Sequence, residues 1–298
     1  MNAWEALPTD TVLGFIGLGN MGGPMSRRLI EAGWPVIGYD AAGAQERLPA
    51  GAQAAASVAE LAAAATVILL SLPDGAASNS VTREIAEARD CRAVVVIDTS
   101  TIGIDAAQTS ANILRAPGIA YVDAPVSGGV SGANAGSLAM MIATDAPVFS
   151  RLRPLLSVMA KNCFHVGNTV GQGQTMKLLN NFLSGTAMTA TAEAIAFGID
   201  HGLDMEVMLN LLNVSSGRNT ATSDKYLNRV LTGTYDAGFA TQLIAKDVKL
   251  YEECVANSGA RSVVGTVVCD QLQRADAALP GSDFTRIYDY VRDSRRGP

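Results

Sequence analysis

The chain has 298 residues, of which 48% are hydrophobic and 17% charged, as expected for a folded globular protein with a substantial core. Its net charge of -6 and its pI of about 5.0 argue against the concentrated basic face that nucleic-acid binding requires, so we predict no nucleic-acid partner. The length favours a larger α/β domain followed by a smaller one.

The cysteines and the N-terminal segment exclude several other classes. Four cysteines lie far apart, without the paired spacing of a zinc site or a disulfide framework, so we predict free thiols and no metal. The N-terminal segment MNAWEALPTD has no basic stretch followed by an apolar core, and we find no apolar run of bilayer-spanning length. These features predict a cytoplasmic protein without a membrane partner.

Short apolar runs rich in Val and Ile alternate with Ala-rich stretches between residues 11 and 167. Strands separated by helices at this spacing predict a mostly parallel sheet with helices on its faces. We therefore predict a doubly wound α/β domain over residues 1–169. The strand candidates are TVLGFIG, PVIGYD, TVILLSL, AVVVIDTS, IAYVDAP, LAMMIA and CFHVG.

The sequence pattern changes after residue 171, where one long stretch with helical apolar periodicity and no Pro predicts a long helix. Segments around 204–212, 239–257 and 261–278 also have helical patterns, and no convincing strand follows. We predict an all-helical domain over residues 170–298, joined to the first by the long helix.

A glycine-rich loop follows the first predicted strand directly and opens a helix. Gly17 suits a tight turn, Gly19 lets the backbone approach a pyrophosphate, and Gly22 allows the helix to pack on the strand. The helix amides then face the phosphates, as in a Rossmann-type dinucleotide site. The alternative is a tight turn that binds nothing. The predicted cofactor loop is Gly17, Leu18, Gly19, Asn20, Met21 and Gly22.

Asp40 ends the second predicted strand, 18 residues after Gly22. A carboxylate there accepts hydrogen bonds from the adenosine ribose hydroxyls and would repel a 2′-phosphate. No Arg follows before Arg47, so the sequence favours NAD, with NADP as the alternative.

The start of the long helix carries a candidate for proton transfer. Residues Gly173, Lys177 and Asn181 are spaced four apart and share one helix face, with Gly173 predicted to leave room above Lys177. A lysine can exchange a proton with an alcohol where desolvation lowers its pKa. The alternative is an exposed lysine without a function. The two histidines, His165 and His201, are better explained as structural residues.

A second glycine-rich stretch follows a later strand, where open α/β sheets bind ligands. Ser127 offers a hydroxyl, and Gly128 and Gly129 expose backbone amides able to hold a carboxylate. An ordinary Gly-rich turn explains the same residues equally well.

Four motifs in this order resemble the β-hydroxyacid dehydrogenases over residues 11–290: FIGLGNMGGPM, DAPVSGG followed by GSLAMM, GQGQTMKLLNN and KDVKL. The resemblance implies an NAD(P)-dependent oxidoreductase that assembles as a homodimer or homotetramer. NVSSGR and GFATQLIAKD are most similar to the 3-hydroxyisobutyrate branch. The chain departs from the family at Ala143 and Thr144, where many relatives have Gly-Gly, and at NTATSDKY, where that branch tends to have an aromatic residue.

The same resemblance assigns roles to individual residues. Lys177 corresponds to the family's catalytic lysine and Asn181 to its substrate-binding asparagine. Lys246 corresponds to a second lysine near the nicotinamide. The substrate anchor falls on Ser127, Gly128 and Gly129, and further cofactor-lining positions fall on Leu72, Pro73 and Thr101.

The sequence therefore predicts hydride transfer between a nicotinamide cofactor and a small 3-hydroxy acid or its semialdehyde, with Lys177 in a cleft between the domains. The alternatives are a tartronate or succinic semialdehyde reductase and a non-catalytic nucleotide-binding module. An imine reductase is a weaker alternative, because those relatives replace the lysine.

Overall fold

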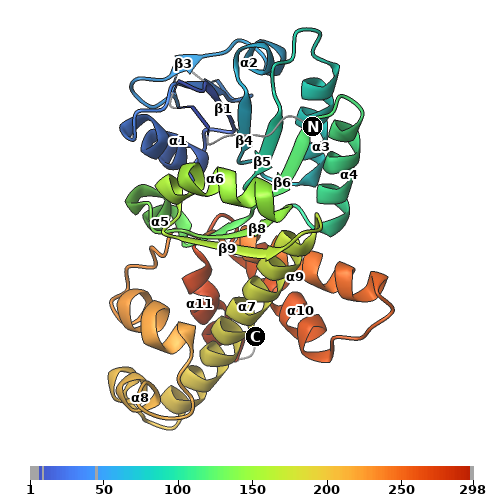
Figure 1. Ribbon diagram of the computed structural model, residues 1–298. Helices are drawn as coiled ribbons and strands as arrows, with labels where there is room; N and C mark the ends of the chain where they lie inside the picture. The colour runs from blue at the N-terminus through green and yellow to red at the C-terminus, as the bar shows by residue number, and fades with distance from the viewer. Residues whose placement is uncertain (1–6, 9, 44–45, 296–298) are drawn as a thin grey trace. The chain divides into compact units, whose positions relative to one another are not determined.

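The computed structural model describes residues 7–8, 10–43 and 46–295 (Figure 1). The chain forms two compact units, Met1–Lys177 and Leu178–Pro298, which meet within one continuous helix. The boundary predicted at residues 169 and 170 stays a prediction. Residues 1–6 and 9 of the N-terminal segment MNAWEALPTD lie outside the described residues.

The first unit is built on one mixed sheet, with strand order β3-β2-β1-β4-β5-β6-β8-β7 and with β9 paired to β8. The pairs from β3 to β6 are all parallel, which confirms the predicted doubly wound arrangement. β8 runs antiparallel to β6 and β7, a reversal that the sequence pattern does not predict. The strands are β1 (Leu13–Ile16), β2 (Val36–Tyr39), β3 (Gln53–Ala54), β4 (Val67–Leu70), β5 (Val95–Asp98), β6 (Ala120–Asp123), β7 (Val126–Ser127), β8 (Ala139–Ala143) and β9 (Asn162–Gly167).

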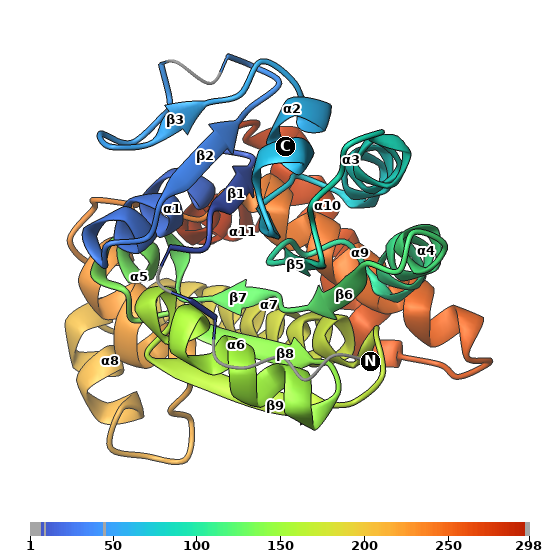
Figure 2. The ribbon, with the colours of Figure 1, turned by 45° about the horizontal axis from the view of Figure 1, so that its top comes forward.

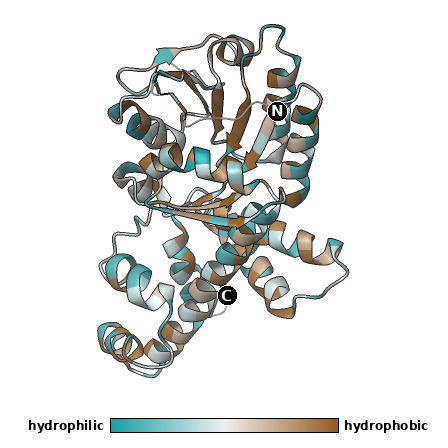
Figure 3. Cartoon of the chain, viewed as in Figure 1, coloured by the Kyte–Doolittle hydropathy of each residue, from teal (hydrophilic) through white to brown (hydrophobic). Residues whose placement is uncertain are grey.

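Apolar cores cover both faces of this sheet, because successive side chains of a strand point to opposite sides. Leu69 belongs to the core that includes Met25 of α1 and Leu155 of α6. Leu70, the next residue, belongs to the core that includes Leu61 of α2 and further residues of α4. Burial on both faces makes the central strands β4 and β5 largely hydrophobic, and Figure 3 shows the central strands of the sheet mostly in brown.

Side-chain caps fix where several helices of the first unit begin. The Ser57 side chain accepts a hydrogen bond from the Glu60 amide, and the Glu60 carboxylate accepts one from the Ala56 amide, so both side chains cap the start of α2. Asp74 caps α3 through the Ala77 amide. Figure 2 shows α3 and α4 side by side. The helices are α1 (Gly22–Glu31), α2 (Val58–Ala64), α3 (Gly75–Glu87), α4 (Ile104–Arg115), α5 (Gly129–Ala135) and α6 (Ala146–Met159).

The second unit is helical, as predicted, and has its own core around Tyr226, Leu272 and Phe284. The predicted helices are present, within a few residues of the expected bounds. The sequence pattern missed a π-helix, η1, and the C-terminal turn and helix. The elements are α7 (Gln172–Asp200), α8 (Met205–Leu212), η1 (Ala221–Val230), α9 (Thr241–Asn257), α10 (Val263–Ala278), η2 (Phe284–Arg286) and α11 (Ile287–Ser294).

α7 corrects the expectation that the chain has no apolar run of bilayer-spanning length. Its 29 residues make it long and apolar enough to cross a membrane, by length and composition alone. The core helix of a soluble protein passes the same test, so the helix does not establish a membrane location. The expected lack of a membrane partner stays a prediction.

Candidate active site

The glycine loop between β1 and α1 has the shape that a dinucleotide requires. Gly17 has φ +90, and a Cβ there would collide with the carbonyl oxygen of Ser71. A Cβ on Gly22 would collide with the carbonyl oxygen of Gly17, so the helix can approach the strand only without one. A Cβ on Gly19 would meet only Arg47 Nη1, at 4.0 Å, which leaves the loop open on that side.

Asp40 lies beside this loop at the end of β2. Its Oδ2 accepts the Leu18 amide and its Oδ1 accepts the Ala42 amide, both at 2.8 Å. Arg47 Nη1 lies 3.6 Å from Asp40 Oδ2, although Arg47 is seven positions further along the chain. The glycine loop, the Asp40 carboxylate and the Arg47 guanidinium therefore lie close together, and the sequence did not predict that Arg47 contacts Asp40.

The loops after β4 and β5 lie next to the glycine loop, because β1, β4 and β5 are neighbouring parallel strands. Leu72 and Pro73 follow β4, and Thr101 follows β5. The Leu72 amide donates to Ser100 Oγ at 2.7 Å, which joins the two loops. The predicted cofactor positions thus gather at the carboxyl edge of the sheet, where such sheets bind ligands.

These residues fit a nicotinamide dinucleotide. The glycines leave the backbone open to a pyrophosphate, the N-terminus of α1 offers amides, and Asp40 stands where a ribose diol needs an acceptor.

Ser127 and the two following glycines form the turn from β7 into α5. Ser127 pairs with Ala139 on β8 and is half-buried. Gly128 has φ +131 and Gly129 has φ +63, conformations that L side chains rarely adopt. Two successive glycines of this kind leave their amides uncovered by side chains, which suits the binding of a carboxylate.

The first turn of α7 is bonded to the end of β6. Asp123 is fully buried, and its Oδ2 accepts the amides of Gly171 (2.9 Å) and Gln174 (3.1 Å). Burial raises the pKa of Asp123 to about 6, against the lowering effect of these hydrogen bonds. A Cβ on Gly173 would lie 2.7 Å from the Met141 carbonyl oxygen and 2.8 Å from Asp123 Cγ. Gly173 therefore serves close packing on the sheet, a different reason from the space above Lys177 that the spacing suggested.

Lys177 lies three residues after Gln174 and is only 7% exposed. This burial contradicts the alternative of an exposed lysine on an amphipathic helix. Lysines are rarely this buried unless they are bonded, so the burial makes Lys177 a candidate functional residue.

Asn181 follows Lys177 by one helical turn and is joined to α9. Its Nδ2 donates to Asp247 Oδ2 at 2.5 Å, and its Oδ1 accepts a hydrogen bond from Asn180 Nδ2 at 3.0 Å. Lys246 Nζ lies 3.1 Å from Asp247 Oδ1. Asp247, 2% exposed, therefore links the two predicted site residues of the second unit. The signal for it was its place directly after Lys246 in KDVKL.

The histidines have other partners. His165 Nε2 bonds the Thr144 carbonyl at 2.7 Å, and its ring stacks on Phe149 at 4.8 Å between centroids. His201 Nδ1 bonds the Phe197 carbonyl at 2.8 Å. Within the described ranges, no three His, Cys, Asp or Glu side chains gather in a way that could hold a metal ion.

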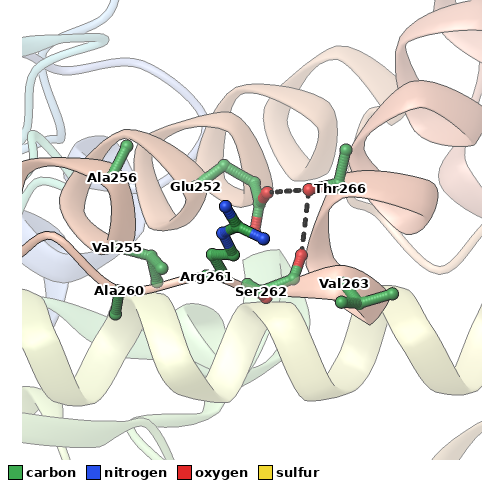
Figure 4. A pocket seen from close by; sticks show the side chains of 8 residues that line it. All are labelled: Glu252, Val255, Ala256, Ala260, Arg261, Ser262, Val263 and Thr266. Atoms are coloured by element: carbon green, nitrogen blue, oxygen red, sulfur yellow. Dashed lines mark hydrogen bonds between the residues drawn. The ribbon is translucent and has the colours of Figure 1, made fainter.

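A pocket of about 270 Å³ opens elsewhere in the second unit, between α9 and α10 (Figure 4). Thr266 Oγ1 donates to Glu252 Oε2 at 2.8 Å on its wall. Its lining contains none of the predicted site residues. The lining residues are Glu252, Val255, Ala256, Ala260, Arg261, Ser262, Val263 and Thr266.

Comparisons with known proteins agree with these motifs. Residues 12–167 match the NAD-binding domain of 6-phosphogluconate dehydrogenase, and residues 171–291 match the NAD-binding domain of NADP-dependent 3-hydroxyisobutyrate dehydrogenase. The chain is 38% identical to 2-(hydroxymethyl)glutarate dehydrogenase of Eubacterium barkeri, over 80% of both chains. It is 36% identical to 3-hydroxyisobutyrate dehydrogenase of Pseudomonas aeruginosa, over 95% of this chain and 99% of that one.

A solved structure is similar over nearly the whole chain. It is Mycobacterium tuberculosis 3-hydroxyisobutyrate dehydrogenase with L-serine, at 31% identity and a TM-score of 0.86. The likeness covers 95% of this chain and 99% of that one. The chain therefore belongs to the β-hydroxyacid dehydrogenase family of NAD(P)-dependent oxidoreductases.

Proposed function

We propose that the chain oxidises the hydroxyl of a small 3-hydroxy acid to the semialdehyde, with Lys177 as general acid and base. The observation that carries this proposal is the burial of Lys177 on the first turns of α7, in a helix that begins against the carboxyl end of β6. A lysine in that setting can take the hydroxyl proton during oxidation and return it during reduction. Bound NAD supplies the hydride acceptor.

The other predicted site residues divide the task of holding the substrate. The Ser127 hydroxyl and the amides of Gly128 and Gly129 bind the carboxylate. Asn181 orients the reacting oxygen, with its amide fixed by Asp247. Lys246 is proposed to lie near the nicotinamide, and its ion pair with Asp247 connects it to the residue that holds Asn181.

The names of the relatives suggest which acids to test. 3-Hydroxyisobutyrate, 2-(hydroxymethyl)glutarate and L-serine share a carboxylate whose neighbouring carbon carries a CH₂OH group. We propose this unit as the part of the substrate that the site recognises. We propose no single acid, because the chain departs from the 3-hydroxyisobutyrate branch over residues 219–226, the segment that leads into and begins η1. Tartronate or succinic semialdehyde reduction is the alternative reaction.

A substrate panel tests this proposal. We expect reduction of NAD with 3-hydroxyisobutyrate, 3-hydroxypropionate, glycerate or serine. We also expect a loss of at least about 100-fold in kcat/KM when the carboxylate of the best acid is converted to its methyl ester, because buried donors are then left unpaired.

The outcome against the proposal is equally clear. Tight NAD binding without turnover of any acid or semialdehyde would instead support a non-catalytic nucleotide-binding module. Equal turnover of acid and ester would contradict the assigned carboxylate site.

We further propose a cytoplasmic homodimer or homotetramer formed by the second unit. Apolar side chains there remain exposed on the outer turns of α8 and α10, which is unusual for a monomer. A second copy of the same chain is the occupant that the family resemblance favours.

A further inference from the structure

One buried side chain at the start of α7 uses every hydrogen-bonding position that it has. Gln174 is 0% exposed. Its Oε1 accepts the amides of Ile102 (2.9 Å) and Gly103 (3.2 Å). Its Nε2 donates to the Ser100 carbonyl (3.1 Å) and to Asp123 Oδ1 (2.8 Å). A side-chain amide offers two donors and one acceptor group with two lone pairs, so Gln174 is fully satisfied.

These bonds connect two parts of the candidate site. Residues 100–103 form the loop after β5 that carries the cofactor position Thr101, and Ser100 also holds the Leu72 amide. Gln174 itself belongs to the helix turn that presents Lys177 three residues later, about 4.5 Å along the helix axis. Gln174 therefore connects the loop at 100–103 to the helix turn that carries Lys177.

Asp123 holds the Gln174 side chain and the start of α7 in place. Its Oδ2 accepts two amides at the start of α7, and its Oδ1 accepts the Gln174 side chain. A carboxylate there also interacts favourably with the positive end of the helix dipole. The close approach at Gly173 leaves the helix no freedom to move toward the sheet.

We propose that Gln174, held by Asp123, is a positioning residue that sets the distance between the cofactor loop at 100–103 and Lys177. This rests on the proposed role of Lys177. Gln174 touches neither reacting atom in this account and acts through the loop and the helix that it joins.

The carboxylates around Gln174 allow its role to be tested by placing a further ionisable group at position 174. Asp98 on β5 and Tyr121 on β6 face the same region, and Tyr121 donates to Asp98 at 3.1 Å. Burial raises the pKa of Asp98 as well as that of Asp123. A second carboxylate at position 174 would add repulsion at high pH, whereas a protonated one would restore the lost donor to Asp123.

The Gln174→Glu variant is therefore expected to lose kcat in a pH-dependent way. We expect kcat to be about 100-fold below wild type at pH 9 and within about 10-fold at pH 6, since misplacement of a reacting group costs up to about 100-fold. Gln172→Glu is the matched control. The Gln172 side chain accepts the Thr169 amide and is not bonded to Gln174 or Asp123, and Glu keeps that acceptor. Its kcat should stay within about 2-fold of wild type at both pH values.

Hydrogen exchange gives a readout that does not depend on turnover. In Gln174→Glu at pH 9 and in the neutral variant Gln174→Met, the amides of Ile102, Gly103 and Gly171 should exchange at least about 10-fold faster than in wild type. Gln172→Glu should leave them unchanged. If no acid in the panel is oxidised, the proposed function fails while this exchange result still reports on the network.

Two results would overturn the positioning role. One is a Gln174→Glu variant whose kcat ratio to wild type is the same at pH 6 and pH 9. The other is a folded Gln174→Met variant with wild-type kcat and wild-type exchange, which also decides the matter if Gln174→Glu does not fold.

Discussion

At the residue scale, the chemistry depends on how each charged group is held. Asp40 is bonded to two backbone amides, which fixes its carboxylate against the cofactor loop. Arg47 contacts the same carboxylate, but its side chain is 46% exposed. An exposed ion pair contributes little, typically about 0.2–1 kcal/mol. Asp40 should therefore dominate coenzyme choice, with Arg47 as a smaller opposing influence.

Coenzyme binding tests this balance. Asp40→Ser should weaken NAD about 10-fold and strengthen NADP, because a charge-assisted bond to the ribose is lost together with the repulsion of a 2′-phosphate. Arg47→Gln should weaken NADP by a few-fold and leave NAD nearly unchanged. Titration calorimetry on wild type and both variants, each with NAD and with NADP, measures the dissociation constants. An Asp40→Ser variant that keeps the wild-type ratio of NAD to NADP affinity would refute the assignment.

At the element scale, the sequence predicted those features that follow from periodicity. The four-residue strands of the parallel half (β1, β2, β4, β5 and β6) and the helices α7 to α10 each have several residues that repeat one pattern. β3 and β7 have two residues each and were missed, and the direction of β8 relative to β6 follows from no local pattern. η1 was missed because a π-helix has no distinct sequence period, and its start is fixed by Asn219, whose Oδ1 accepts the amides of Ala221 and Thr222.

The candidate site was predictable to a similar extent. Glycine spacing predicted the cofactor loop, and family motifs predicted the roles of Lys177 and Asn181, which stay predictions. The partners Arg47, Gln174 and Asp247 were not predicted, because their roles depend on side-chain contacts that appear only in the folded chain: with Asp40, Asp123 and Asn181 respectively. Gly173 was noticed for its spacing, but its reason is a close approach to the end of β6 and to β8 that only the folded chain reveals.

At the scale of the whole molecule, the proposed assembly would bury exposed apolar side chains of the second unit. Val263, Val264 and Val267 begin α10 with 78%, 55% and 60% of their surfaces exposed. Val207 and Leu211 on α8 are 64% and 62% exposed and lie one turn apart. Apolar side chains repeated along a helix face favour burial against another protein surface.

The Val263→Asp/Val267→Asp double variant should therefore shift the chain toward monomer, because two carboxylates would be buried at the interface. Sedimentation velocity at several concentrations measures the change. Thr266→Ala lies between them on the same helix and serves as a control for general damage to α10. A wild-type chain that is monomeric at all concentrations would contradict the proposed assembly.

The central claim concerns the amine of Lys177, and Lys177→Ala tests it most directly. NADH formation should be followed with the best acid of the panel, alongside NAD binding measured by calorimetry. The account predicts NAD affinity within about 3-fold of wild type and a loss of kcat of at least about 100-fold, as for removal of a general acid and base. Retention of kcat within about 3-fold of wild type would contradict it.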